Sequence, residues 1–134
     1  MREIKCRGRD ERGKWHHGYY VDGYMFDSMT GQAETVPFIV KAQLQGHERV
    51  VSETVGQFTG ITDVYGNDIY EGDIVHMYSV MPGCDIDEIG IVKFIECAFL
   101  FEKTDGSNGW SIFNEATEIQ VIGNIYENSE LLKN

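Results

Sequence analysis

Three aspartates near glycines form the group of residues in this 134-residue chain that most resembles an acid–base site. Asp63, Asp68 and Asp73 follow one another at intervals of five within GQFTGITDVYGNDIYEGDIV, residues 56–75. A catalytic carboxylate pair needs one member with a raised pKa, and the sequence around these residues indicates no apolar pocket that would raise it. Aspartates in turns accept hydrogen bonds from the nearby backbone. We therefore predict that all three belong to turns or strand entries.

Two further segments contain residue types that can act as metal ligands. His16 and His17 are adjacent, and adjacent side chains of a strand point to opposite faces, so we expect no shared ion. The acidic loop 84–88, with His76 upstream, mixes sulfur and carboxylate ligands in a spacing typical of no standard site. Its candidate ligands are Cys84, Asp85, Asp87 and Glu88. We favour a solvated loop there, with cation binding as the open alternative, and a hairpin turn at residues 105–109.

The familiar catalytic motifs are missing from the chain. It contains no GxGxxG, P-loop, HExxH or GxSxG pattern, and neither Ser107 nor Ser111 has a neighbouring histidine in sequence. A nucleophilic serine needs such a base to activate it. We therefore expect no enzyme activity, no catalytic residue, no cofactor and no metal.

The N-terminal segment interleaves basic and aromatic residues, as single-strand binders do. Residues 1–14 carry six basic and three acidic side chains. A non-specific explanation is that long basic side chains cover a strand face and pair with acidic groups of the same or a neighbouring chain. We take this segment as the candidate interaction surface, with the members Arg2, Lys5, Arg7, Arg9, Arg12, Lys14, Trp15, His16, Tyr19 and Tyr20.

The charge of the chain is unevenly distributed. Residues 1–46 carry a net charge of +1 and residues 47–134 a net charge of −12, which gives −11 in total. A surface this acidic repels phosphate backbones, so nucleic-acid binding by the second part is disfavoured. A basic edge and an acidic body on one small chain favour complementary assembly, and we expect a homo-oligomer or a protein partner.

Length and composition indicate one soluble domain. The 134 residues suffice for a single core, and no apolar run reaches the roughly 18 residues of a membrane span. Three widely spaced cysteines form no CxxC pair, which is typical of a reducing compartment. We expect a cytoplasmic protein of a bacterial host cell.

Alternation with a period of two indicates an all-β protein with little helix. Residues 2–21 read as one hairpin and YMFDSM to VPFIVKAQL as a second, in which Pro37 belongs at a strand start or an edge. Residues 45–53 read as the connection to a series of short strands separated by glycine turns. The last residues, 127–134, can form one closing helical turn after Asn128 or Ser129.

Three blocks of the sequence resemble the phage-encoded YopX family. They are MREIKCRGRDERGKWHHGYYV at the start, ETVGQFTGITDVYGNDIYEGDIV in the middle and VIGNIYENSELL at the end, so the resemblance spans essentially the whole chain. It implies one YopX-like unit over 1–134, with N-terminal strands at 1–46 and an SH3-like β-barrel at about 55–126 on which the N-terminal hairpins pack. It implies a bacteriophage or prophage setting and no assigned activity. Ser129 stands where the family usually has proline, so the terminal turn is less sharply fixed.

These observations predict an accessory protein that acts through self-association or a host or phage protein partner. Nucleic-acid binding by the N-terminal hairpin, to single or double strands, is the alternative. A third hypothesis is that the acidic face mimics nucleic acid.

Overall fold

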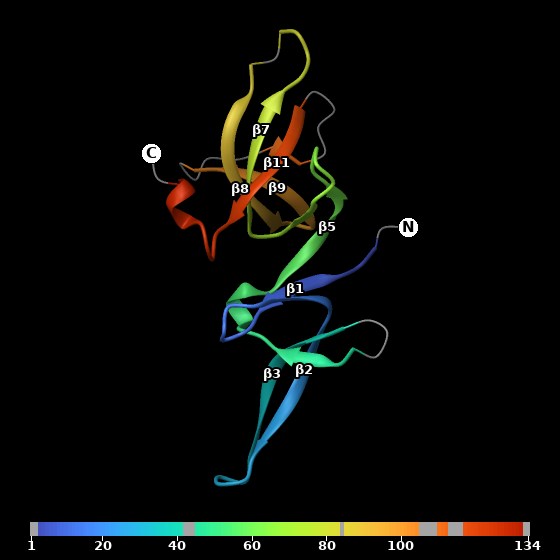
Figure 1. The fold of residues 1–134 in the computed structure, drawn as a ribbon, viewed down its shortest axis with the longest axis vertical. Helices are drawn as coiled ribbons and strands as arrows, with labels where there is room; N and C mark the ends of the chain where they lie inside the picture. The colour runs from blue at the N-terminus through green and yellow to red at the C-terminus, as the bar shows by residue number, and fades with distance from the viewer. Residues whose placement is uncertain (1–2, 42–44, 84, 105–109, 113–116, 133–134) are drawn as a thin grey trace. The chain divides into compact units, whose positions relative to one another are not determined.

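The computed structural model describes residues 3–41, 45–83, 85–104, 110–112 and 117–132 of the chain (Figure 1). Its regular structure in these ranges is strand, apart from two short 3-10 turns, η1 (Ser52–Thr54) and η2 (Ser129–Leu132). The predicted all-β class is therefore confirmed. The chain divides into two compact units, residues 1–58 and 59–134. The division lies within strand β5 (Gly56–Thr62), later than the connection expected at residues 45–53.

The first unit is an antiparallel sheet in which one strand is much longer than its neighbours. Its strands are β1 (Cys6–Arg9), β2 (Trp15–Asp27), β3 (Gln32–Val40), β4 (His47–Arg49) and the first part of β5. They are hydrogen-bonded in the order β4-β3-β2-β1-β5. Residues 15–18 of β2 pair with β1, whereas residues 19–27 pair with β3. Both predicted hairpins are present, but they are not separate, because β2 runs without a break through both pairings.

Pro37 lies inside β3, opposite Asp22 of β2. Its carbonyl accepts a hydrogen bond from the Val50 N–H, on the β4 side of the strand. The nitrogen and carbonyl of a strand residue point to the same side, so the missing N–H also faces that side. Strand β4 pairs only with residues 38–40 of β3, and Pro37 therefore lies where β3 becomes an edge, as its chemistry requires.

Four apolar residues of the first unit are buried. Val36, Ile39, Val50 and Phe58 are each at most 7% exposed. Val50 fills the space over Gly8, where an added Cβ would lie 2.8 Å from a Val50 methyl carbon. A side chain at position 8 would therefore displace Val50.

The second unit contains the larger core. Its strands are the end of β5, then β6 (Asp68–Tyr70), β7 (Asp73–Ser79), β8 (Asp87–Ile95), β9 (Ala98–Lys103), β10 (Trp110–Ser111) and β11 (Thr117–Asn124). Five of them form an antiparallel sheet in the order β10-β9-β8-β7-β11. The core contains Ile69, Val75, Met77, Val92, Phe99, Phe101, Ile112 and Ile119. The predicted SH3-like closure, and the packing of the N-terminal hairpins on it, stay predictions.

The closing helical turn predicted at the C-terminus is present as η2. Asn128 precedes it, its side-chain oxygen accepts the Asn124 N–H at 3.2 Å, and its carbonyl accepts the Leu131 N–H at 2.9 Å. Ser129 begins the turn.

The β8–β9 turn places two non-glycine residues in the left-handed region. Ile95 pairs with Ala98, so Glu96 and Cys97 form the two-residue loop, with φ of 50° and 66°. This is the backbone of a type I′ turn, which strongly prefers Asn-Gly because side chains crowd the backbone at positive φ. The loop therefore stores strain.

Replacing the loop by Glu96→Asn with Cys97→Gly should stabilise the protein by about 1–2 kcal/mol, because both residues tolerate positive φ. Urea unfolding at equilibrium measures the change. Glu96→Gln alone is the control, since it removes the charge and keeps the strain. A double variant no more stable than the wild type would show that the loop carries no strain.

Candidate functional site

The β1–β2 turn is built around the carboxylate of Asp10. Its Oδ1 accepts the main-chain N–H groups of Arg12 and Lys14, both at 2.9 Å, and its Oδ2 accepts the Nε2–H of His16 at 2.8 Å. The Asp10 N–H donates to the Lys14 carbonyl at 2.9 Å and closes the loop. One side chain thus fixes both ends of the turn, as aspartates at such positions commonly do.

The same contacts change the acidity of Asp10. The hydrogen bond from His16, helped by the main-chain bonds from Lys14 and Arg12, lowers the pKa of Asp10 to about 2. His16 is 4% exposed, and its Nδ1 has no hydrogen-bond partner among the residues that the structure describes. The Asp10–His16 hydrogen bond therefore ties the turn to a buried side chain of β2.

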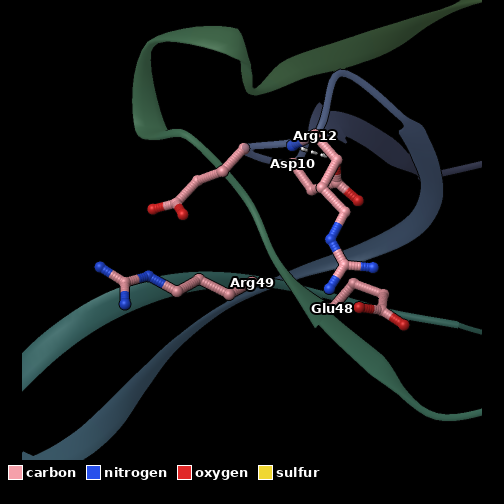
Figure 2. Close-up of a pocket in the computed structure, with 5 residues that line it drawn as sticks. Asp10, Arg12, Glu48 and Arg49 are labelled. Atoms are coloured by element: carbon pink, nitrogen blue, oxygen red, sulfur yellow. Dashed lines mark hydrogen bonds between the residues drawn. The ribbon is translucent and has the colours of Figure 1, made fainter.

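A hollow of about 270 Å³ opens beside this turn, between it and β4. Figure 2 shows Arg12 extending from the turn toward Glu48, with Arg49 on the same strand as Glu48. Three acidic and two basic residues line the hollow: Asp10, Glu11, Arg12, Glu48 and Arg49. A second hollow of about 330 Å³ lies against the same turn and is lined partly by Val51 and Thr54. The mixed charge suits a protein surface better than an isolated anion.

Several members of the candidate interaction surface share one face of the first sheet. Arg7 pairs with His17 and Arg9 with Trp15, and Tyr19 follows two residues after His17, so all five side chains project from the same face. The guanidinium carbon of Arg7 lies 4.6 Å from the Trp15 ring centroid. At this distance the Arg7 cation interacts with the ring.

The other members are placed differently. His16 and Tyr20 lie on the opposite face, and Arg7 and His16 are both buried. Lys5 is half-buried, with its Nζ 4.7 Å from the Phe58 ring centroid. Arg12 and Lys14 are exposed, Arg9 is half-buried, and Arg2 lies outside the described residues. The exposed members are therefore chiefly the turn cations and the two tyrosines, and the tyrosines lie on opposite faces of the sheet.

The three aspartates of the middle segment occupy turns and strand entries. Asp63 accepts the N–H groups of Tyr65, Asn67 and Val121 at 2.8–2.9 Å. Burial would raise the pKa of Asp63, but the hydrogen bonds from Val121 and Asn67 outweigh it and the pKa is lowered. The Asp73 carboxylate accepts the Tyr70 N–H at 2.8 Å, and Asp68 begins β6. A lowered pKa suits a structural carboxylate and not a general acid.

The metal candidates do not converge in the described ranges. His76 Nε2 contacts the Asp87 carboxylate, and no group of three or more potential ligands occurs among the described residues. His17 is exposed whereas His16 is buried, so the adjacent histidines face apart as predicted. Cys84 and the hairpin turn predicted at residues 105–109 lie outside the described residues.

The sequence interpretation missed an exposed two-stranded extension, residues 19–35, which we call the arm. Sixteen of its seventeen residues are exposed, the exception being Gly23. Beyond the ends of β1 and β4 it consists only of β2 and β3, and it extends away from them in Figure 1. Its exposed apolar residues are Tyr19, Tyr20, Val21, Tyr24, Met25, Phe26 and Met29. The apolar runs YYV and YMF, which break the alternation, were the signal.

Comparison with known proteins identifies the family of this chain. The family model for YopX protein matches residues 12–133, so the chain belongs to the YopX family. The fold resembles the crystal structure of protein yopX from Bacillus subtilis, with a TM-score of 0.55 and 19% identity over 100% of this chain and 98% of that one. It also resembles protein EF1440 from Enterococcus faecalis, with a TM-score of 0.53 and 20% identity over 99% and 100%. Among curated proteins, no sequence matches this chain.

These likenesses confirm the family predicted from the three sequence blocks. At under 25% identity, the two solved structures support the fold alone. In the described residues, no helix is long and apolar enough to cross a membrane.

The Asp10→Asn variant should be less stable than the wild type at pH 6, because it removes the charge that engages His16. A lowered carboxyl pKa contributes stability above its unfolded value, near 4, and this contribution is lost as pH falls toward 2. The difference between the two proteins should therefore shrink between pH 4 and pH 2.

Urea unfolding at pH 6, 4 and 3 measures this, and Glu11→Gln, an exposed carboxylate of the same turn, is the matched control. Equal stability of Asp10→Asn and the wild type at pH 6 would contradict the role given to Asp10.

Proposed function

We propose that the chain is a non-enzymatic interaction module of a bacteriophage or prophage, which acts in the host cytoplasm through self-association or a protein partner. The arm is the observation that supports this best. Tyr24 is 76% exposed, Phe26 69% and Met29 92%. An isolated two-stranded hairpin is marginally stable in water, and a partner that covers these side chains would stabilise it.

The two faces of the arm differ in how far the rest of the unit covers them. Tyr20, Asp22, Tyr24 and Phe26 alternate along β2 and therefore share one face. On the other face, the Phe38 ring lies across Gly23, where an added Cβ would be 2.5 Å from the ring, and the Arg49 Nη1 donates to the Met25 sulfur at 3.4 Å. The second face is thus partly covered from within the unit, and the aromatic face is the one open to a partner.

The carboxylates support the non-enzymatic part of the proposal. Asp63 and Asp73, which a catalytic interpretation would need, accept hydrogen bonds from main-chain N–H groups. Moving either carboxylate into a reaction would break the turn that it holds.

Replacing Tyr24 and Phe26 by serine should weaken association at least about tenfold, because buried aromatic anchors dominate interface energies. Sedimentation equilibrium at low and high salt measures the solution mass. Tyr65→Ser is the matched control, since Tyr65 is 73% exposed and lies outside the arm. A wild-type chain that is monomeric at low salt and retains no protein in a pull-down would contradict the proposal.

Nucleic-acid binding is the second candidate, and one observation favours it. Arg7, Arg9, Trp15 and Tyr19 share a face, as a stacking platform requires. The buried Arg7 and the net charge of −11 oppose it.

We expect no change in fluorescence anisotropy when labelled single or double strands are titrated with the chain at low salt. Salt-sensitive binding that is lost in Arg9→Glu with Lys14→Glu would favour this second function over the first.

A further inference from the structure

The arm is acidic as well as apolar. Asp22, Asp27 and Glu34 give it a charge of −3, and no lysine or arginine occurs from Trp15 to Val40. The rest of residues 1–58 carries eight basic and five acidic residues, a net +3. Within this one unit, the net charge of the arm and that of the remaining residues are therefore equal in magnitude and opposite in sign.

Part of this positive charge is exposed at the β1–β2 turn, beside the acidic Asp10 and Glu11. The side chains of Arg12 and Lys14 are exposed there, while their main-chain N–H groups are held by Asp10. Hollows of about 270 and 330 Å³ lie against this turn, and Arg12 lines both. Hollows beside an arginine are suitable receptors for aromatic side chains, which stack on guanidinium groups and fill interface pockets.

The aromatic face of the arm supplies part of an interface. Taking about 200 Å² for a fully exposed aromatic side chain, Tyr20, Tyr24 and Phe26 expose on the order of 400 Å². A stable protein–protein interface buries about 800 Å² on each partner. The aromatic face of the arm therefore offers about half of the area that one stable contact needs.

We propose that the arm of one copy docks on the β1–β2 turn of a second copy, with Tyr24 and Phe26 in the hollows and Asp22 facing Arg12 and Lys14. This inference rests on the proposed function and names the partner. Pairing of one arm with another would bring together two surfaces that each carry a net charge of −3, and their repulsion disfavours it. A contact between two different surfaces is heterologous, so repetition gives a ring, or a filament where the rotation does not close.

A charge exchange between two variants tests this directly. One variant carries Asp22→Lys and Glu34→Lys in the arm, and the other carries Arg12→Glu and Lys14→Glu in the turn. Asp27 is left unchanged because its carboxylate accepts the Met29 N–H at 2.9 Å in the β2–β3 turn. The turn variant keeps the hydrogen bonds to Asp10, which involve main-chain groups only. Circular dichroism verifies that both variants fold.

Each variant alone should associate at least about tenfold more weakly than the wild type, because its arm and turn then carry like charges. An equimolar mixture should recover wild-type association, since each arm finds a turn of opposite charge. Sedimentation velocity at low salt measures all four samples.

Four results would overturn the inference. Variants that associate like the wild type, or a mixture that does not recover, would exclude docking of arm on turn while leaving self-association in place. A monomeric wild type whose arm binds another basic protein would exclude the second copy and leave the interaction module. A monomeric wild type that binds no protein would remove both proposals.

Discussion

The unequal length of neighbouring strands is the constraint on which the first unit depends. Strand β2 has thirteen residues, and β1 pairs with only the first four of them. The remaining nine pair with β3 alone among the described residues. The side chains on their aromatic face therefore stay largely exposed, Tyr24 at 76% and Phe26 at 69%. Exposure of Tyr24 and Phe26 thus follows from strand length, and the proposed binding role rests on this exposure.

Carboxylates in turns supply the rigidity that such an extension needs at its base. Asp10 accepts hydrogen bonds from Arg12, Lys14 and His16, and thereby holds the turn that joins β1 to β2. Asp63 stabilises a turn of the second unit in the same way, because it accepts hydrogen bonds from the N–H groups of its own turn and of Val121 in β11. In both places the charge is engaged by donors, which keeps the carboxylate ionised and unsuited to proton transfer.

The sequence predicted those features that depend on residues close together in the chain. The turn after Asp63 could be predicted because its donors, Tyr65 and Asn67, lie within four residues, whereas the bond from Val121 spans 58 residues and has no sequence signal. Alternation predicted that His16 and His17 face apart. It could not show that Arg7 is buried, because the neighbours that cover a residue come from other strands. The arm was missed because the point where β1 ends, relative to β2, depends on pairing and not on composition.

Hydrogen exchange at increasing protein concentration tests the central claim, that the arm is completed by another molecule. The account predicts that amides in residues 19–35 exchange fast in dilute solution and become protected as concentration rises, while those of the core strands β7 and β8 do not change. Protection of the arm that is the same at all concentrations, and equal to that of the buried strands, would contradict the account, because the arm would then be stable without a partner.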